Sequence, residues 1–140
     1  MTSIADQKMS EIGALKSKML QFPRGFYEAR QRHYDAQQRV KTLKAELDDS
    51  RMEALLTVSA AKVNGGDKPL YPNEAARNAA VSKALAENPS YRDLSKRLEG
   101  AETDEFNASL ELRRLEDEHK AWRAAADLVI AEVSLLVAAR

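Results

Sequence analysis

Glu116 and His119 have the spacing in this 140-residue chain that comes nearest to a metal-binding motif. An E-x-x-H pair lies on one face of a helix, and di-iron helical bundles use two such pairs together with two further glutamates. His33 cannot supply a second pair, because the residue three positions before it is Arg30. The chain has no cysteine, which excludes thiolate zinc sites, iron–sulfur clusters and disulfide frameworks. We therefore expect no metal and no other cofactor.

Catalytic motifs are also missing from the sequence. No G-x-S-x-G elbow is present, and Gly65 and Gly66 lack the spacing of a phosphate-binding loop. Adjacent carboxylates such as Asp48 and Asp49 have the spacing of a solvated helix surface. These observations predict no catalytic residues, no small-molecule substrate and no enzymatic activity.

Charge is unevenly distributed along the chain, although the totals cancel at 22 basic and 22 acidic residues. Residues 1–44 hold nine Lys or Arg against four acidic residues, whereas residues 99–132 hold ten acidic residues against four basic ones. In the first block the cations are interleaved with aromatic rings, a combination that binds the phosphates and stacks on the bases of single-stranded nucleic acid. The predicted nucleic-acid-binding residues are Arg24, Arg30, Arg32, Tyr34, Lys41 and Lys44, with a second basic group at Arg92, Lys96 and Arg97.

A structural interpretation of the same charges is also open. Two antiparallel helices would lay the basic block beside the acidic block, so that each neutralises the other as flanking charges do in coiled coils.

The composition favours an all-α fold, since Ala, Leu, Glu, Lys and Arg are abundant and only 6% of the residues are aromatic. A track of mostly apolar residues recurs with alternating spacings of three and four from Tyr91 to Leu136, which is typical of a coiled coil. A second track in the first half is interrupted by Pro23 and Gly25, where we expect a kink or short break. We expect one all-helical domain over 1–140, with an N-terminal helix over 1–22, a long helix over 25–63, a loop and short helix over 64–88, and a long helix over 89–139 that Asn88 caps.

The two tracks predict an elongated antiparallel helical hairpin in which paired residues have numbers that add to about 152. This register places Leu47 beside Glu105 and His33 beside His119. The two histidines would form a polar layer that loosens between pH 7.5 and 5.5. Residues 62–90 would project beyond the hairpin, either as a cap over its tip or as a head that binds a protein partner.

A hairpin of two helices buries little apolar surface, so we expect a homo-oligomer in the form of a helical bundle. The N-terminal helix and the C-terminal tail are expected at its centre. The predicted interface residues are Leu15, Met19, Phe22, Val129, Val133 and Leu136.

The cytoplasm is the expected location, because the first residues lack the pattern of a signal peptide. No membrane partner is expected either. The most apolar stretch, 121–139, contains three charged residues, and a membrane-spanning helix needs about 20 nearly uncharged ones.

A family resemblance is carried by the aromatic and basic segment from Phe26 to Lys44, by the glycines that follow it, and by the segment Ala-Glu-Asn-Pro-Ser-Tyr-Arg-Asp-Leu at 86–94. Over about 110 residues the chain resembles the UvsY-like recombination mediators of T4-type phages, and more generally coiled-coil proteins of phages and prophages. The resemblance implies an oligomer that contacts single-stranded DNA and a recombination protein in a bacterial or phage-infected cell. It implies DNA contacts at Arg24, Arg30, Arg32, Tyr34 and Lys41. The chain departs from the family at its C-terminal end, which is apolar rather than basic.

Two functions are therefore expected of a non-enzymatic, self-associating helical protein. One is an accessory of DNA recombination or repair that contacts single-stranded DNA or a recombinase. The alternative is a scaffold that binds a protein partner through residues 62–90 and makes no contact with nucleic acid.

Overall fold

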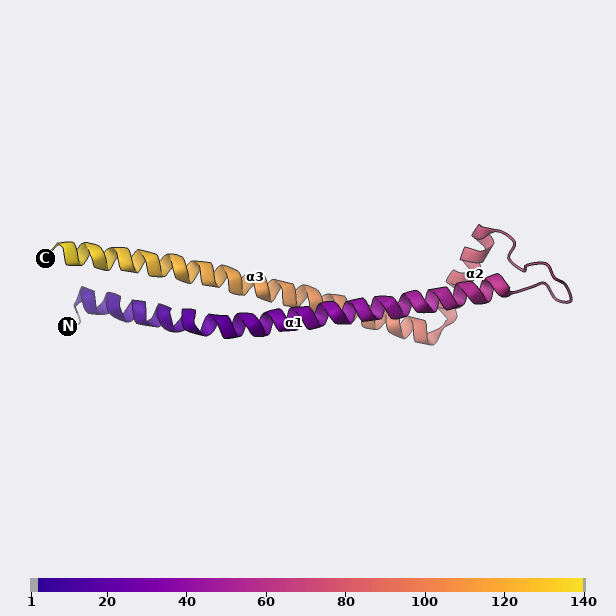
Figure 1. Cartoon of the computed structure of the whole chain (residues 1–140), viewed down its shortest axis with the longest axis horizontal. Coiled ribbons are helices and arrows are strands. Elements are labelled where there is room, and N and C mark those ends of the chain that lie inside the picture. Colours follow the sequence, from indigo (N-terminus) through magenta and orange to yellow (C-terminus); the bar gives the residue numbers. More distant parts are fainter. Residues whose placement is uncertain (1–2, 140) are drawn as a thin grey trace. The chain divides into compact units, whose positions relative to one another are not determined.

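The structure is a computed structural model that describes residues 3–139 and contains three helices, α1 (Ile4–Ala60), α2 (Glu74–Glu87) and α3 (Pro89–Ala138). The chain is all-α, and α1 packs against α3 as an antiparallel helical hairpin, which confirms the predicted fold class (Figure 1). Its contacts divide into two compact units. The first unit comprises α1 up to Tyr34 together with α3 from Phe106, and the second unit is Asp35–Glu105.

Helix α1 runs through Pro23 without a break, so the expected interruption at residues 23–24 is wrong. A proline inside a helix removes one backbone hydrogen bond and costs about 3 kcal/mol. Aromatic residues flank Pro23, and the rings of Phe22 and Phe26 stack with their centres 5.1 Å apart. The first turn of the helix is capped by Ser3, whose Oγ accepts a hydrogen bond of 3.1 Å from the Asp6 N–H.

Helix α1 ends at Ala60, three residues before the expected end of the second predicted helix. The next residues turn back through backbone hydrogen bonds instead. The Leu70 N–H donates to the Ala61 carbonyl at 2.9 Å, and the Val63 N–H donates to the Lys68 carbonyl at 3.0 Å. Gly65, with a φ of 76°, supplies the left-handed residue that this tight loop requires.

Asparagine side chains start the other two helices. The Asn73 side chain accepts a 2.7 Å hydrogen bond from the Ala76 N–H at the start of α2. At the start of α3 the Asn88 Oδ1 accepts a 3.0 Å bond from the Ser90 N–H, with Pro89 at the first helical position. The expected cap at Asn88 is confirmed.

In the first unit the start of α1 and the end of α3 lie side by side and antiparallel, with the first residues of α1 and the last of α3 at the same end (Figure 1). The Phe22 ring stacks on His119 with a centre separation of 4.1 Å and meets Trp122 edge-on at 6.4 Å. Near the helix ends, the Lys8 ammonium donates to the Glu132 carboxylate at 2.6 Å. This bond raises the pKa of Lys8 above its usual value.

These contacts overturn the predicted register. The numbers of paired residues add to 140 for Lys8 and Glu132 and to 141 for Phe22 and His119, rather than to 152. His33 lies eleven residues beyond Phe22 on α1, about 16 Å along the helix axis, so it cannot pair with His119. The expected histidine layer is therefore wrong, and the expected loosening between pH 7.5 and 5.5 loses its basis.

The second unit has the same antiparallel pairing and the better-buried core. Val40, Leu43 and Ala101 form a buried cluster, and Leu94 and Leu98 pack against it. Leu43 is 2% exposed and Ala101 1%. The small side chain of Ala101 lets the two helices approach closely enough to cover Leu43 from solvent.

Helix α2 lies beside the last turns of α1 (Figure 1). Leu85 of α2 and Val58 of α1 are both buried and line a common cavity. Residues 74–87 therefore cover the end of α1 rather than project beyond it, which agrees with the expected cap. A role of this segment in binding a partner stays a prediction.

The observed register predicts that Phe22 and His119 depend on each other for stability. Phe22→Ala and His119→Ala should each lower the free energy of unfolding, and the double variant should lose about 0.5 to 1.5 kcal/mol less than the sum of the single losses. Urea unfolding of the four proteins in this double-mutant cycle measures the coupling. The control cycle pairs His33→Ala with His119→Ala, whose effects should add to within about 0.5 kcal/mol. Coupling in the control and none in the first cycle would contradict this register.

Candidate interaction surfaces

Four of the aromatic and basic residues in the first unit share one face of α1. Arg24, Tyr27, Arg30 and Tyr34 follow each other at spacings of three, three and four residues, and all four are exposed. The two tyrosine side chains are 69% and 55% exposed. Tyr27 was not among the predicted site residues, although its helical spacing to Tyr34, two turns away, places it on the same face.

Local contacts engage some of these cations. Arg24 pairs with Glu28 at 3.3 Å within α1, and the Arg30 guanidinium lies 5.8 Å from the centre of the Phe26 ring. Arg32 is exposed on α1, close enough to Glu111 of α3 to contribute to the depressed pKa of that carboxyl. Both side chains of these pairs lie at the surface, where such contacts contribute little to stability.

Asp104 and Glu132 of α3 pair with Arg39 and Lys8 of α1, whereas Glu111 and Glu118 are neutralised from within their own helix. Arg114 forms a bidentate pair with Glu111, at 2.7 and 3.0 Å, and also bonds to Glu118. Hydrogen bonding from Arg114 is the main reason that the pKa of Glu111 is lowered, and the pKa of Arg114 is raised in return. The basic block of α1 is therefore not the main partner of Glu111 and Glu118.

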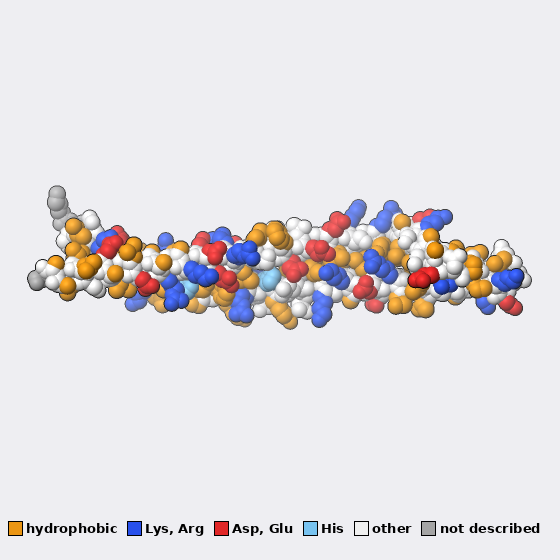
Figure 2. Space-filling model, turned by 90° about the horizontal axis from the view of Figure 1, so that it is seen from above, with side chains coloured by type: hydrophobic (Ala, Val, Ile, Leu, Met, Phe, Trp, Pro, Cys, Tyr) orange, Lys and Arg blue, Asp and Glu red, His pale blue; other side chains and the backbone are white. Residues whose placement is uncertain are grey.

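The predicted basic residues of the second unit are also exposed. Within residues 3–139, no acidic group lies at ion-pair distance from any of them, namely Lys41, Lys44, Arg92, Lys96 and Arg97. The nearby Arg39 does reach Asp104 across the two helices, at 3.9 Å between exposed side chains. The face drawn in Figure 2 shows cationic, anionic and hydrophobic side chains mixed at the surface. Neutralisation of the basic block 1–44 by the acidic block 99–132, which was the alternative to nucleic-acid binding, is thus limited to isolated contacts.

The predicted oligomer-interface residues face mostly into the hairpin itself. Val129 is buried within the single chain, and Phe22 stacks on His119. Leu15, Met19 and Val133 are half-buried, while Leu136 is 40% exposed. Met19 also lines a groove between α1 and α3, and an oligomer interface through the predicted residues stays a prediction.

The E-x-x-H pair is not part of a cluster of ligands. Glu116 is exposed, and His119 is covered by Phe22. Over residues 3–139 no group of three or more His, Asp or Glu side chains is placed to hold a metal ion.

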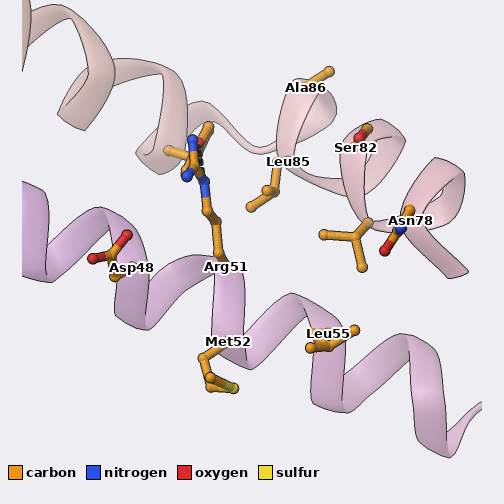
Figure 3. A pocket seen from close by; sticks show the side chains of 10 residues that line it. Asp48, Arg51, Met52, Leu55, Asn78, Ser82, Leu85 and Ala86 are labelled. Atoms are coloured by element: carbon orange, nitrogen blue, oxygen red, sulfur yellow. Dashed lines mark hydrogen bonds between the residues drawn. The ribbon is translucent and has the colours of Figure 1, made fainter. Parts of the chain in front are cut away.

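A groove of about 840 Å³ opens between α1, α2 and the start of α3 in the second unit. Leu85 of α2 and Arg51 of α1 point into the space between these helices (Figure 3). The Arg51 Nε donates a 3.0 Å hydrogen bond to the Tyr91 hydroxyl, and its guanidinium lies 6.0 Å from the centre of that ring. The remaining apolar lining includes Leu55 and Val81.

A smaller groove of about 430 Å³ lies between α1 and α3 in the first unit. Its apolar lining includes Ile12, Met19, Leu20 and Ile130, and its charged lining includes Lys16 and Asp127.

Comparison with protein-family models, with curated proteins and with solved structures finds no match. The likeness to UvsY-like mediators therefore rests on the residues that suggested it. In the described part of the chain, no helix has both the length and the apolar character that crossing a membrane requires.

The burial of Leu85 predicts that α2 contributes to the stability of the second unit. Leu85→Ala should lower the free energy of unfolding by about 2 to 4 kcal/mol, because it leaves a cavity between α2 and α1. The matched control is Leu56→Ala on the same part of α1, where the side chain is 64% exposed and the loss should stay within about 0.5 kcal/mol. Equal losses in chemical unfolding would show that α2 is not docked on α1.

Proposed function

We propose that this protein is a self-associating helical binding protein that acts without catalysis. The observation that carries the proposal is the imbalance of the first unit, whose described residues include two buried hydrophobic residues and twelve large hydrophobic residues that are exposed. The buried pair is Ala29 and Val129. Exposed apolar side chains in such number are typical of a surface that another helix covers.

The second unit provides the comparison within the same chain. It buries six hydrophobic residues and exposes five large ones, and two of the buried residues, Val58 and Leu85, lie where α2 packs as a third helix over the end of α1. The first unit has no third helix, so a further chain is the natural source of the missing layer.

Self-association predicts a solution mass that is a multiple of the 15.6 kDa chain. Sedimentation equilibrium over a range of protein concentrations should give at least twice this mass at high concentration, with dissociation on dilution. Helicity measured by circular dichroism across the same range separates dissociation from unfolding. The mass of a single folded chain at every concentration would refute the proposal.

A second candidate function, contact with single-stranded DNA as an accessory of recombination in the bacterial or phage-infected cytoplasm, is favoured by a separate observation. Tyr27 and Tyr34 are exposed on one face of α1 with Arg30 between them. Rings on a helix face stack on bases regardless of sequence, and flanking cations neutralise phosphates. Two carboxylates of the acidic block of α3, Glu111 and Glu118, are held by Arg114 of the same helix.

This candidate predicts binding of a labelled oligonucleotide that weakens as salt rises. Tyr34→Ala should weaken the binding about tenfold, because the stacking of one base contributes roughly 1 to 3 kcal/mol. Arg30→Glu combined with Arg32→Glu should weaken it further and reduce its salt dependence. Fluorescence anisotropy at two salt concentrations measures both effects. The matched control is Arg113→Glu, an exposed cation on α3, which should change the affinity little. Absence of binding at low salt would exclude the DNA role and leave self-association standing.

A further inference from the structure

The groove of the first unit has two features that few apolar surfaces combine. Its apolar lining comes from both helices, with Ile12 and Leu20 on α1 and Ile130 on α3. It also carries a cation on the α1 wall, Lys16, and an anion on the α3 wall, Asp127, next to a second cation, Arg123 of α3. A molecule that fills this groove must supply an apolar surface together with the complementary charges.

Lys16 and Asp127 lie at the same level of the hairpin. Their numbers add to 143, within a few residues of the 140 and 141 found for the contacts of Lys8 and Phe22. Both side chains are exposed, and neither has an ion-pair partner among residues 3–139. Each charge is therefore available to a partner that approaches the groove.

We propose that a second copy of this chain fills the groove, so that two hairpins pack groove against groove as a four-helix bundle. The proposal rests on the self-association proposed above and assigns the face that carries it. A two-fold axis parallel to the helices places α1 of each copy against α3 of the other, antiparallel and at the same level. Lys16 of one copy then faces Asp127 of the second copy, and the symmetry forms this pair twice.

The apolar residues fit the same arrangement. Ile12 and Leu20 of one copy are at the levels of Ile130 and Arg123 of the other. Ile12 and Ile130 then pack on each other, and the aliphatic part of Arg123 covers Leu20 while its guanidinium reaches solvent. A groove with both charges on opposite walls is complementary to itself, which is the condition for a two-fold symmetric contact.

Charge exchange tests the proposal with the full-length chain. Lys16→Asp and Asp127→Lys should each raise the dissociation constant of the oligomer at least about tenfold, because each places like charges opposite one another. The double variant, with both substitutions, should restore the constant to within about threefold of the original. Sedimentation equilibrium measures the constants, and circular dichroism confirms that every variant remains helical.

Matched controls carry the same charge changes on residues outside the groove. Lys18→Asp and Asp117→Lys alter exposed side chains of α1 and α3 that do not line it, and the oligomer should be unaffected. Ile130→Asn should dissociate the oligomer, whereas Leu128→Asn should not, although their exposures are similar at 52% and 61%.

The outcomes separate this inference from the proposed function. Self-association that is unchanged by either single charge variant, or that is lost equally in the controls, overturns the assignment of this face while self-association stands. Dissociation by Leu128→Asn but not by Ile130→Asn also overturns it, because the contact would then lie on the other side of α3. If the protein without substitutions is monomeric at all concentrations, both this inference and the proposed self-association are overturned.

Discussion

A pair of helices can bury only the stripe along which the two touch, and this limit governs both halves of the molecule. In the second unit α2 covers the end of α1 through Leu85, while α1 and α3 form the cluster around Leu43. The first unit has only α1 and α3, whose contact stripe is built from Phe22, His119 and neighbouring half-buried residues. Its outward faces keep large apolar side chains, since nothing in the same unit is left to cover them.

The register of the two helices follows from the same need for burial. In the observed pairing Leu43 lies among Leu94, Leu98 and Ala101, so apolar side chains meet apolar side chains. The predicted register set Leu47 against Glu105, which would place a carboxylate in the contact stripe. The observed pairing also brings Tyr91 to the level of Arg51, which leaves the last turns of α1 free for α2. Removing α2 from this position would expose those turns again.

Local residue type and spacing were sufficient to predict the fold class, the short helix, the long last helix and the cap at Asn88, whereas the two helices predicted over 1–22 and 25–63 are the single helix α1. They could not settle the register. The predicted pairing is shifted along the helices by about ten residues from the observed one. Three helical turns contain about 10.8 residues, so the same faces of the two helices meet in both pairings. Continuity through Pro23 was also beyond local rules, and the contact of the neighbouring Phe22 with His119 joins residues that are far apart in the sequence.

The candidate sites show the same division between local and tertiary information. Exposure of the nine predicted nucleic-acid residues followed from their positions outside the apolar track, and the structure places all of them at the surface. The interface prediction selected the most apolar track, part of which the hairpin buries within the single chain at Val129, whereas Met19 of the same track lines the groove of the first unit. Only the paired structure reveals which apolar residues remain outside the stripe, among them Leu20 and Ile130.

The two proposed activities occupy successive stretches of one face of α1. Lys16, Leu20, Tyr27 and Tyr34 repeat at helical spacing, so the groove residues lead directly into the aromatic and basic residues. On the facing part of α3, apolar lining such as Ile130 gives way to charged residues towards Glu116, which cannot continue an apolar contact. A bundle formed through the groove would therefore end before Tyr27. The bundle would hold the aromatic and basic stretches of the two copies at the same height along the helices. Single-stranded DNA that contacts both stretches would bind more tightly than DNA that contacts one.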